Sequence, residues 1–164
     1  MIKYCKPNEY LDSIYQIDFD ALRKKGIKGI ILDLDETLLP REMLDISPVL
    51  FAFIETIKDK GFSIFLMSNS TKEARVEHVG KTFNIPFVTF AMKPLPFSFE
   101  SARKRLQLFP HEIAVIGDQV FMDILGGNWA KMYTILVKPM NPETFWLRKL
   151  MRKAEDWVLK KLAL

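Results

Sequence analysis

Two aspartates, Asp33 and Asp35, stand at the end of a short apolar and β-branched run that begins at Ile27. A third, Asp118, follows another apolar run directly after Gly117. If the two runs are neighbouring strands, three carboxylates meet at one edge and repel one another unless a cation lies between them. With no histidine or cysteine nearby in the sequence, this oxygen-only set favours Mg²⁺ over zinc. Taken singly, the acids also fit simpler roles, namely a helix cap and a solvated strand end for the first pair and a β-turn for the third.

A hydroxyl, an amide and a lysine follow the next two apolar runs. Ser68 and Asn69 come directly after Phe62–Met67, and Lys93 precedes Pro94. Each residue alone is common in solvated loops, but a hydroxyl, backbone donors and a fixed positive charge together bind a phosphoryl dianion. With the carboxylates they form the set that phosphoryl transfer needs to neutralise charge on the equatorial oxygens. The sequence therefore predicts phosphoryl-transfer chemistry, with Ser68, Asn69 and Lys93 on the substrate side.

Short apolar runs and segments of helical periodicity alternate along the chain, which indicates a parallel sheet with helices on both faces. The predicted strands are 27–34, 62–67, 86–90, 113–116 and 133–137, and the predicted helices are 8–25, 47–61, 71–83, 98–108 and a short one near 121–125. Loops after the carboxyl ends of such strands carry the functional residues. Here those loops hold Asp33 and Asp35, Ser68 and Asn69, Lys93, and Asp118 and Asp123.

Length and composition fit one globular domain with a full hydrophobic core, since the chain has 164 residues, 49% of them apolar and 27% charged. Its single cysteine, Cys5, excludes an internal disulfide framework, and no apolar run follows the first lysines as in a signal peptide. We therefore expect a reducing, cytoplasmic location. Residues 1–137 hold equal numbers of basic and acidic side chains, so the net charge of +4 lies in residues 138–164. The neutral core offers no basic groove, and no nucleic-acid partner is expected.

The segment DLDETL at 33–38 resembles the DxDx[T/V] nucleophile motif of the haloacid dehalogenase superfamily of phosphohydrolases. The other three motifs of that superfamily are matched in chain order, by Ser68, by Lys93 and by Asp118 with Asp123. The resemblance implies a three-layer, Rossmann-like α/β fold, with a five-stranded parallel sheet and helices on both faces. It also implies hydrolysis of phosphomonoesters.

Two stretches, GDQVFMDILGGN at 117–128 and AMKP at 91–94, are most similar to a small cap-less branch of the superfamily. This branch includes the bacterial YqeG-type proteins and the mitochondrial phosphatidylglycerophosphate phosphatases. The chain departs from it at Glu36, where the branch often has asparagine, and at Met122, where it often has threonine. Neither position is a catalytic carboxylate, so the departures concern substrate orientation near Glu36 and not the reaction.

The resemblance implies catalytic roles for the matched residues. Asp33 would be the nucleophile that forms an aspartyl-phosphate, and Asp35 would protonate the leaving alcohol and then activate water. Ser68 would hydrogen-bond the phosphoryl oxygens beside Asn69. Lys93 would neutralise those oxygens and tether the nucleophile.

The resemblance also implies a magnesium site. Mg²⁺ would be bound by Asp33, by Asp35 through its main-chain carbonyl, and by Asp118. Asp123 would act from behind these ligands or through a metal-bound water. Thr37 would hold the turn by a hydrogen bond.

We expect two parts in the chain, a hydrolase core over 1–140 that includes the N-terminal helix and a basic amphipathic helix within 141–164. On a helical wheel, one broad arc is apolar and the rest is basic; the apolar arc holds Trp146, Leu147, Leu150, Met151, Ala154, Trp157, Val158 and Leu162, and the basic remainder holds Arg148, Lys149, Arg152, Lys153 and Lys160. Such a helix lies in a membrane interface, where each basic residue near anionic lipid contributes about 1 kcal/mol. Residues 145–162 are thus a candidate for peripheral membrane contact. The alternative is packing on the domain itself or on a second subunit.

Only nine residues separate Thr37 from Ser47, so no cap domain is expected over the site. An open site admits bulky substrates, or is closed by a membrane surface or by a second copy in a homo-oligomer. The leading hypothesis is a Mg²⁺-dependent phosphatase of phosphatidylglycerophosphate at the inner face of a membrane, in phospholipid synthesis. The alternatives are a phosphatase of a soluble sugar phosphate or nucleotide and, outside the enzymes, a receiver-like phospho-acceptor. A receiver carries its phosphorylated aspartate after the third strand, where this chain has Lys93.

Overall fold

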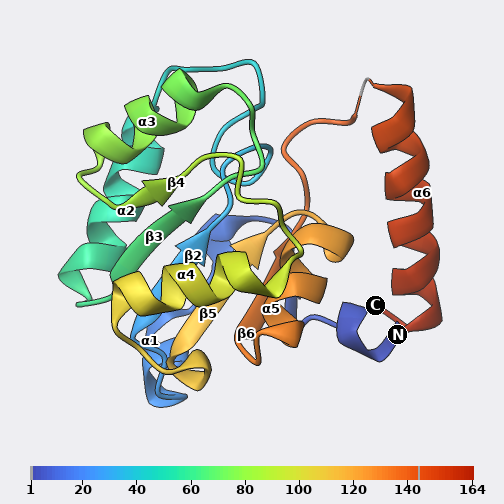
Figure 1. Cartoon of the computed structure of the whole chain (residues 1–164), viewed down its shortest axis with the longest axis horizontal. Coiled ribbons are helices and arrows are strands. Elements are labelled where there is room, and N and C mark those ends of the chain that lie inside the picture. The colour runs from blue at the N-terminus through green and yellow to red at the C-terminus, as the bar shows by residue number, and fades with distance from the viewer. Residues whose placement is uncertain (1, 144) are drawn as a thin grey trace.

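In the computed structural model, which describes residues 2–143 and 145–164, six parallel strands form one sheet (Figure 1). They are β1 (Glu9–Leu11), β2 (Gly29–Leu32), β3 (Ser63–Met67), β4 (Phe87–Val88), β5 (Ile113–Gly117) and β6 (Tyr133–Val137), in the order β1-β6-β5-β2-β3-β4. Leu32 of β2 pairs with Ile116 of β5, so the residues that follow these two strands meet at one edge. The predicted parallel α/β fold is confirmed, with six strands instead of five.

The helices are α1 (Phe19–Lys24), α2 (Pro48–Asp59), α3 (Glu73–Thr82), α4 (Pro96–Leu106), α5 (Leu125–Trp129) and α6 (Trp146–Lys161). Shorter turns lie at Ile2–Cys5, Ile14–Gln16 and Pro110–Glu112, and a π-helical turn at Val120–Ile124 leads into α5. Ser47 caps α2: its hydroxyl accepts a hydrogen bond from the Leu50 amide at 3.1 Å.

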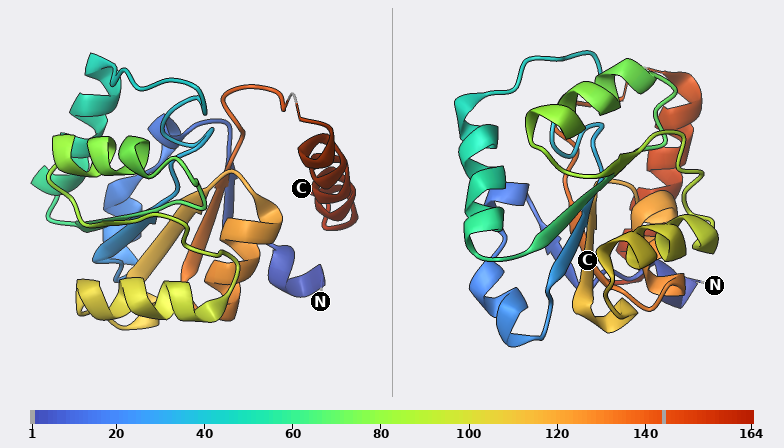
Figure 2. Two further views of the ribbon diagram at one scale, coloured as in Figure 1. Left: turned by 45° about the horizontal axis from the view of Figure 1, so that its top comes forward. Right: turned by 60° about the vertical axis from the view of Figure 1, so that its left-hand side comes forward.

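Alternate residues of the central strand face opposite helix layers. Ile30 and Leu32 pack in one apolar cluster with α1, α2 and α3, whereas Ile31 packs in a second cluster with α4. The sheet therefore lies between two helix layers, as Figure 2 shows from two directions. Because β2 is buried along its whole length, its carboxyl end delivers Asp33 to a protected edge of the sheet.

The predicted helix over 8–25 is wrong. β1 lies there instead and pairs with β6, with Glu9 opposite Ile135, and the Asp18 carboxylate caps the short helix α1. A parallel edge strand depends on a partner far along the chain, which local periodicity does not reveal. The helical spacing arises because two separate elements contribute to the same core cluster, the turn Ile14–Gln16 through Ile14 and α1 through Phe19 and Leu22.

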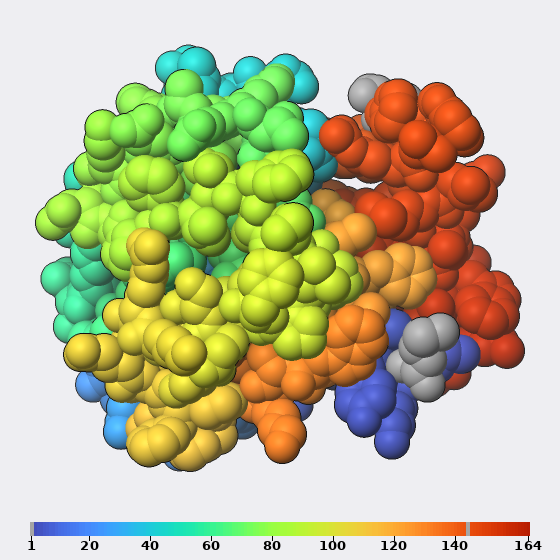
Figure 3. Space-filling model, viewed as in Figure 1, coloured from blue at the N-terminus to red at the C-terminus, as the bar shows by residue number. Residues whose placement is uncertain are grey.

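α6 forms one flank of the molecule, next to the N-terminal turn (Figures 1 and 3). Its C-terminal half packs through Val158 and Leu159 against Cys5 and Leu136. The segment between β2 and α2 is a short loop, and no additional domain covers the sheet edge in the described ranges. No helix within residues 2–143 and 145–164 has the length and apolar character that crossing a bilayer requires.

Candidate active site

The carboxyl ends of β2 and β5 bring together Asp33, Asp118 and Asp123. One oxygen from each lies within 4.8 Å of the others, and all three residues are buried. The neighbouring strands therefore place Asp33 and Asp118 together, as the sequence predicts. The Asp35 side chain points elsewhere, and Asp123 takes the third position in this carboxylate cluster.

Lys93 is the cationic partner of the carboxylate cluster. Its buried ammonium donates to Asp33 Oδ1 and to Asp123 Oδ1, each at 2.6 Å, and to the Met67 carbonyl at 3.1 Å. Burial lowers the pKa of Lys93, but the charges of Asp123 and Asp33 outweigh this effect and raise the pKa above its ordinary value. Lys93 is therefore a permanent positive charge against the oxygens of Asp33.

The remaining charge of the cluster fits a bound cation. Burial raises the pKa of Asp123 to about 6, against the lowering effect of Lys93, and burial followed by the charge of Asp33 raises the pKa of Asp118 well above its ordinary range. The Thr37 hydroxyl lies 3.1 Å from Asp33 Oδ2 and 3.3 Å from Asp118 Oδ1, between the two carboxylates. Crowded, buried carboxylate oxygens with excess negative charge are the donor set of a hard divalent cation such as Mg²⁺.

Gly117 explains why the fourth motif reads Gly-Asp. A Cβ atom at Gly117 would lie 2.2 Å from Cγ of Asp123, so any larger residue displaces that carboxylate. The Gln119 amide donates to Asp123 Oδ2 at 3.1 Å and completes its fixation. The glycine thus makes room for Asp123 beside β5.

Asp35 faces two arginines. Arg75 of α3 and Arg41 of the loop between β2 and α2 each bind one oxygen of the Asp35 carboxylate, and the Arg41 contact measures 3.0 Å. Burial raises the pKa of the Asp35 carboxyl, against the lowering effect of Arg75. A raised pKa suits a group that must carry a proton to a leaving alcohol.

Arg75 was not predicted from the sequence. It is buried on the inner face of α3 next to Val76 and also donates to the main-chain carbonyls of Met43 and Pro40, at 2.9 and 2.8 Å. It thereby fixes the loop after β2 relative to Asp35. The sequence did hold a signal for it: Arg75 lies on the same face of the predicted helix as the apolar residues Val76 and Val79, where a charged residue needs a buried partner.

Ser68 and Asn69 lie where predicted, at the end of β3. Asn69 uses both ends of its side-chain amide on Lys93: Oδ1 accepts from the Lys93 amide at 2.8 Å, and Nδ2 donates to the Lys93 carbonyl at 3.1 Å. Asn69 therefore positions the main chain of Lys93. The Ser68 hydroxyl accepts from the Ser70 amide at 3.0 Å and lines the cavity.

A cavity of about 200 Å³ opens beside these groups. It is lined by Asp33, Asp35, Arg41, Ser68, Asn69, Lys93, Gln119, Met122, Arg148 and Met151. Its volume suits a phosphoryl group, with the rest of an ester extending outward. Because Arg148 and Met151 belong to α6, the C-terminal helix forms one wall of the catalytic cavity.

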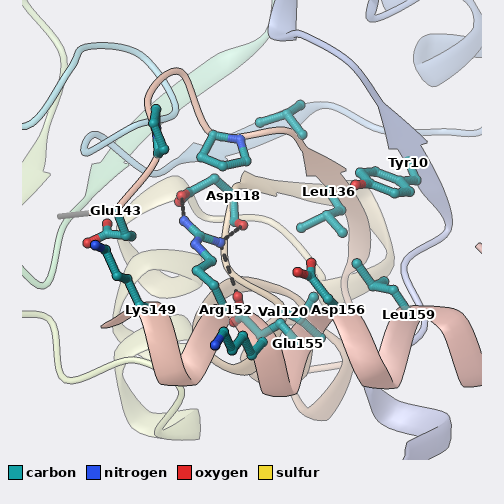
Figure 4. A pocket seen from close by; sticks show the side chains of 14 residues that line it. Tyr10, Asp118, Val120, Leu136, Glu143, Lys149, Arg152, Glu155, Asp156 and Leu159 are labelled. Carbon is teal, nitrogen blue, oxygen red and sulfur yellow. Dashed lines mark hydrogen bonds and ion pairs between the residues drawn. The ribbon is translucent and has the colours of Figure 1, made fainter. Parts of the chain in front are cut away.

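α6 also reaches the carboxylate cluster directly. The Arg152 guanidinium donates to Oδ2 and to the main-chain carbonyl of Asp118, and Figure 4 shows this contact at a second cavity, of about 350 Å³, under α6. Arg152 lies 3.1 Å from Glu155, whose other oxygen accepts from the Phe121 amide at 3.0 Å. Neither residue was predicted as part of the site, because both fall within the helix that was considered for its surface.

Glu36 ties the chain before α6 to the active-site loop. Its backbone is left-handed, with φ of 64°, which is unusual for a residue with this side chain. Its buried carboxylate accepts from the amides of Arg41 and Asn141, both at 2.9 Å, and its carbonyl accepts from the Met140 amide at 3.0 Å. The departure noted at this position thus serves to anchor the segment that leads to α6.

Comparisons with known proteins identify the family of the chain. Residues 90–163 match the family model described as HAD-hydrolase-like. The chain is 33% identical over 160 residues to the probable phosphatase YqeG of Bacillus subtilis (strain 168), covering 98% of this chain and 92% of that protein. It is 28% identical over 160 residues to phosphatidylglycerophosphate phosphatase 1, chloroplastic/mitochondrial, of Arabidopsis thaliana, covering 92% of this chain but 46% of that protein.

Among solved structures, NagD from E. coli K-12 shares the fold, with a TM-score of 0.57 at 16% identity, over 76% of this chain and 91% of that one. The similarity to YqeG extends along nearly the whole of both chains, through every strand that carries a site residue. The chain therefore belongs to the haloacid dehalogenase superfamily of phosphatases.

Proposed function

We propose that this protein is a Mg²⁺-dependent phosphomonoesterase that works through an aspartyl-phosphate on Asp33. The observation that carries the proposal is the setting of Asp33, where Lys93 binds one carboxylate oxygen and Thr37 the other at the end of a buried strand. A carboxylate oriented by these two contacts can attack phosphorus in line. The adjoining cavity presents the Ser68 hydroxyl and the Lys93 ammonium to a phosphoryl dianion.

The proposed reaction has two halves. An Asp33 oxygen bonds to phosphorus while the ester P–O bond breaks, and the leaving alkoxide takes the proton of Asp35. Asp35, now a carboxylate, removes a proton from the water that attacks the aspartyl-phosphate, which releases inorganic phosphate and restores Asp33. Burial of Asp35 favours the protonated form that the first half needs.

Asp33, Asp118 and the main-chain carbonyl of Asp35 are the proposed Mg²⁺ ligands, because all three offer hard oxygen atoms. The cation supplies positive charge against the phosphoryl oxygens. Asp123 is bound to Lys93 and supports the three ligands without binding the cation itself.

Asp35→Asn is expected to slow the hydrolysis of alkyl phosphomonoesters by about 10²- to 10⁴-fold, because their leaving group needs a proton. The leaving group of p-nitrophenyl phosphate does not, so the variant should release about one equivalent of p-nitrophenol in a burst and then stall at the water-attack step. Stopped-flow absorbance measures the burst. Equal slowing of both esters with no burst would contradict the acid–base role of Asp35.

For the substrate we propose a phosphatidylglycerophosphate-type lipid phosphate at an anionic membrane surface. Two curated relatives are named as phosphatases of this lipid, although the chain spans 46% and 60% of their lengths. The loop around Lys93 exposes several apolar side chains, namely Phe90, Met92, Leu95 and Phe97. An open site whose neighbouring loop exposes apolar side chains is suited to an ester whose acyl chains remain in a bilayer.

The outer face of α6 supports the same substrate. Trp146 and Trp157 are 65% and 53% exposed, and Leu147 and Leu150 lie exposed between them. The packed face of α6 is a different one and uses Val158 and Leu159, so packing on the domain leaves the tryptophans free for another contact. Exposed lysines flank this outer face, namely Lys149, Lys153, Lys160 and Lys161. Exposed tryptophans flanked by lysines are typical of a helix that lies on anionic lipid.

The test is phosphate release with Mg²⁺ from phosphatidylglycerophosphate in anionic vesicles, beside glycerol 3-phosphate, a sugar phosphate and a nucleotide. We expect strong preference for the lipid. In the double variant Trp146→Ser/Trp157→Ser, vesicle binding and the ratio of lipid to soluble-ester turnover should fall by about 10-fold or more. The matched control is Phe109→Ser, which removes a 66% exposed aromatic ring before β5, at the opposite end of the strand from the site.

Each outcome separates the candidate substrates. Preference for a soluble ester, with no effect of the tryptophans, would assign the enzyme to sugar phosphates or nucleotides and leave the outer face of α6 for a second copy of the chain. Equal loss in the Phe109 control would show that general surface hydrophobicity, and not α6, determines vesicle binding.

A further inference from the structure

Arg152 brings a second positive charge to the carboxylate cluster from outside the four motifs. Its guanidinium binds Asp118 Oδ2 and the Asp118 carbonyl (Figure 4). The other oxygen of that carboxylate, Oδ1, faces Thr37 and Asp33. Arg152 therefore binds Asp118 through Oδ2 and the carbonyl, whereas Oδ1, which accepts from Thr37, has no contact with Arg152.

The position of Arg152 is held from two sides. Glu155, one helical turn on and itself buried, lies 3.1 Å from the guanidinium and also accepts from the Phe121 amide. Val158 and Leu159 bury the next turn of α6 in the core. Because a half-buried guanidinium with hydrogen bonds to two buried carboxylates keeps its geometry, Arg152 is a fixed charge of the site and not a mobile surface residue.

The charge balance of the site then depends on Arg152. Four buried carboxylates, Asp33, Asp118, Asp123 and Glu155, surround two cationic side chains, Lys93 and Arg152, so two net negative charges remain. Without Arg152, the same carboxylates would be balanced by Lys93 alone and would keep a third negative charge. A divalent cation is attracted more strongly by the second arrangement, whereas a phosphoryl dianion is repelled more strongly.

We propose that Arg152 is a positioning residue that acts through Asp118 to weaken cation binding and to favour the phosphoryl dianion. In this way α6 supplies part of the positive charge that balances the carboxylates of the four motifs. The inference rests on the proposed function, since it assumes that Asp33 and Asp118 bind Mg²⁺.

The experiment measures the Mg²⁺ dissociation constant by isothermal titration calorimetry of the full chain at pH 8 without substrate. Arg152→Gln is expected to bind Mg²⁺ about 10-fold more tightly than the wild type, and its KM for a phosphomonoester should rise about as much. Arg152→Lys keeps the charge and should bind Mg²⁺ within about 3-fold of the wild type. Lys24→Gln is the matched control, because it removes an exposed positive charge from α1, away from the site and from α6.

A purely structural role for Arg152 predicts the opposite sign, because loosening of α6 would disorder Asp118 and weaken Mg²⁺ binding. Weaker or unchanged Mg²⁺ binding in Arg152→Gln therefore overturns the inference. If that variant does not fold, Arg152→Lys decides, since a 10-fold weaker affinity would mean that guanidinium geometry and not charge is needed. A wild type that binds no Mg²⁺ and releases no phosphate overturns the proposed function as well, whereas normal wild-type binding with an unaffected Arg152→Gln overturns only this inference.

Discussion

Phosphate release is expected to fall by about 10⁴-fold or more in Asp33→Asn, because an amide cannot attack phosphorus. Asparagine has nearly the shape of aspartate, and Thr37 and Lys93 retain other partners in Asp118 and Asp123. We therefore expect the variant to fold. The measurement is steady-state release of inorganic phosphate with Mg²⁺ from the best substrate of the panel, together with the thermal unfolding curve.

The matched control for Asp33→Asn is Asp59→Asn, which makes the same chemical change at an exposed position at the end of α2. It should retain wild-type turnover. A wild-type enzyme that forms an acid-stable, base-labile phosphoprotein on rapid quench, absent from Asp33→Asn, would support the nucleophile assignment directly. Activity within about 100-fold of the wild type in a folded Asp33→Asn protein would exclude Asp33 as the nucleophile.

Lys93→Met is expected to lose both activity and stability. Lys93 is buried between Asp33 and Asp123, and removing one partner of a buried ion pair costs about 3–5 kcal/mol because the remaining charges are left without a counter-ion. Chemical denaturation in the presence of EDTA measures the free energy of unfolding, and phosphate release measures the loss of turnover. The two losses have different causes, since the first concerns the buried carboxylates and the second the phosphoryl oxygens.

A double variant separates these causes. Lys93→Met/Asp123→Asn also removes one of the stranded carboxylates, so it should recover part of the stability lost in Lys93→Met while remaining inactive. Lys72→Met, which removes an exposed lysine paired with Glu42, should change the free energy of unfolding by less than about 0.5 kcal/mol. Unfolding of Lys93→Met at the wild-type denaturant concentration would contradict the assigned charge network.

The site residues that the sequence identified are those in short segments at the ends of apolar runs. Asp33, Ser68 and Asp118 could be predicted because each directly follows the strand that positions it, and Lys93 because it lies in the loop that follows β4. The parallel pairing of β2 with β5 then brings Asp33 and Asp118 together. The haloacid dehalogenase motifs strengthened this prediction because they contain the same residues in the same order along the chain.

Local periodicity was misleading where an element depends on a distant partner. β1 was predicted as helix because Ile14, Phe19 and Leu22 happen to recur at helical spacing, although its hydrogen bonds go to β6. For the same reason, the helical wheel did not show which face of α6 packs on the domain. Its apolar arc contains Trp146 and Trp157, which are exposed. The face that packs on the domain is the one that places Arg152 against Asp118 and Val158 in the core.

The sequence by itself determined the parallel α/β class, the edge of the sheet that carries the candidate site, and the proposed nucleophile, because these depend on residues that are neighbours in the chain. Only the tertiary structure decided which charges surround that site. Arg75 reaches Asp35 across 40 residues and Arg152 reaches Asp118 across 34. Such pairings cost little loop entropy once the sheet has formed, but no local pattern specifies them, since Coulomb attraction does not depend on separation along the chain.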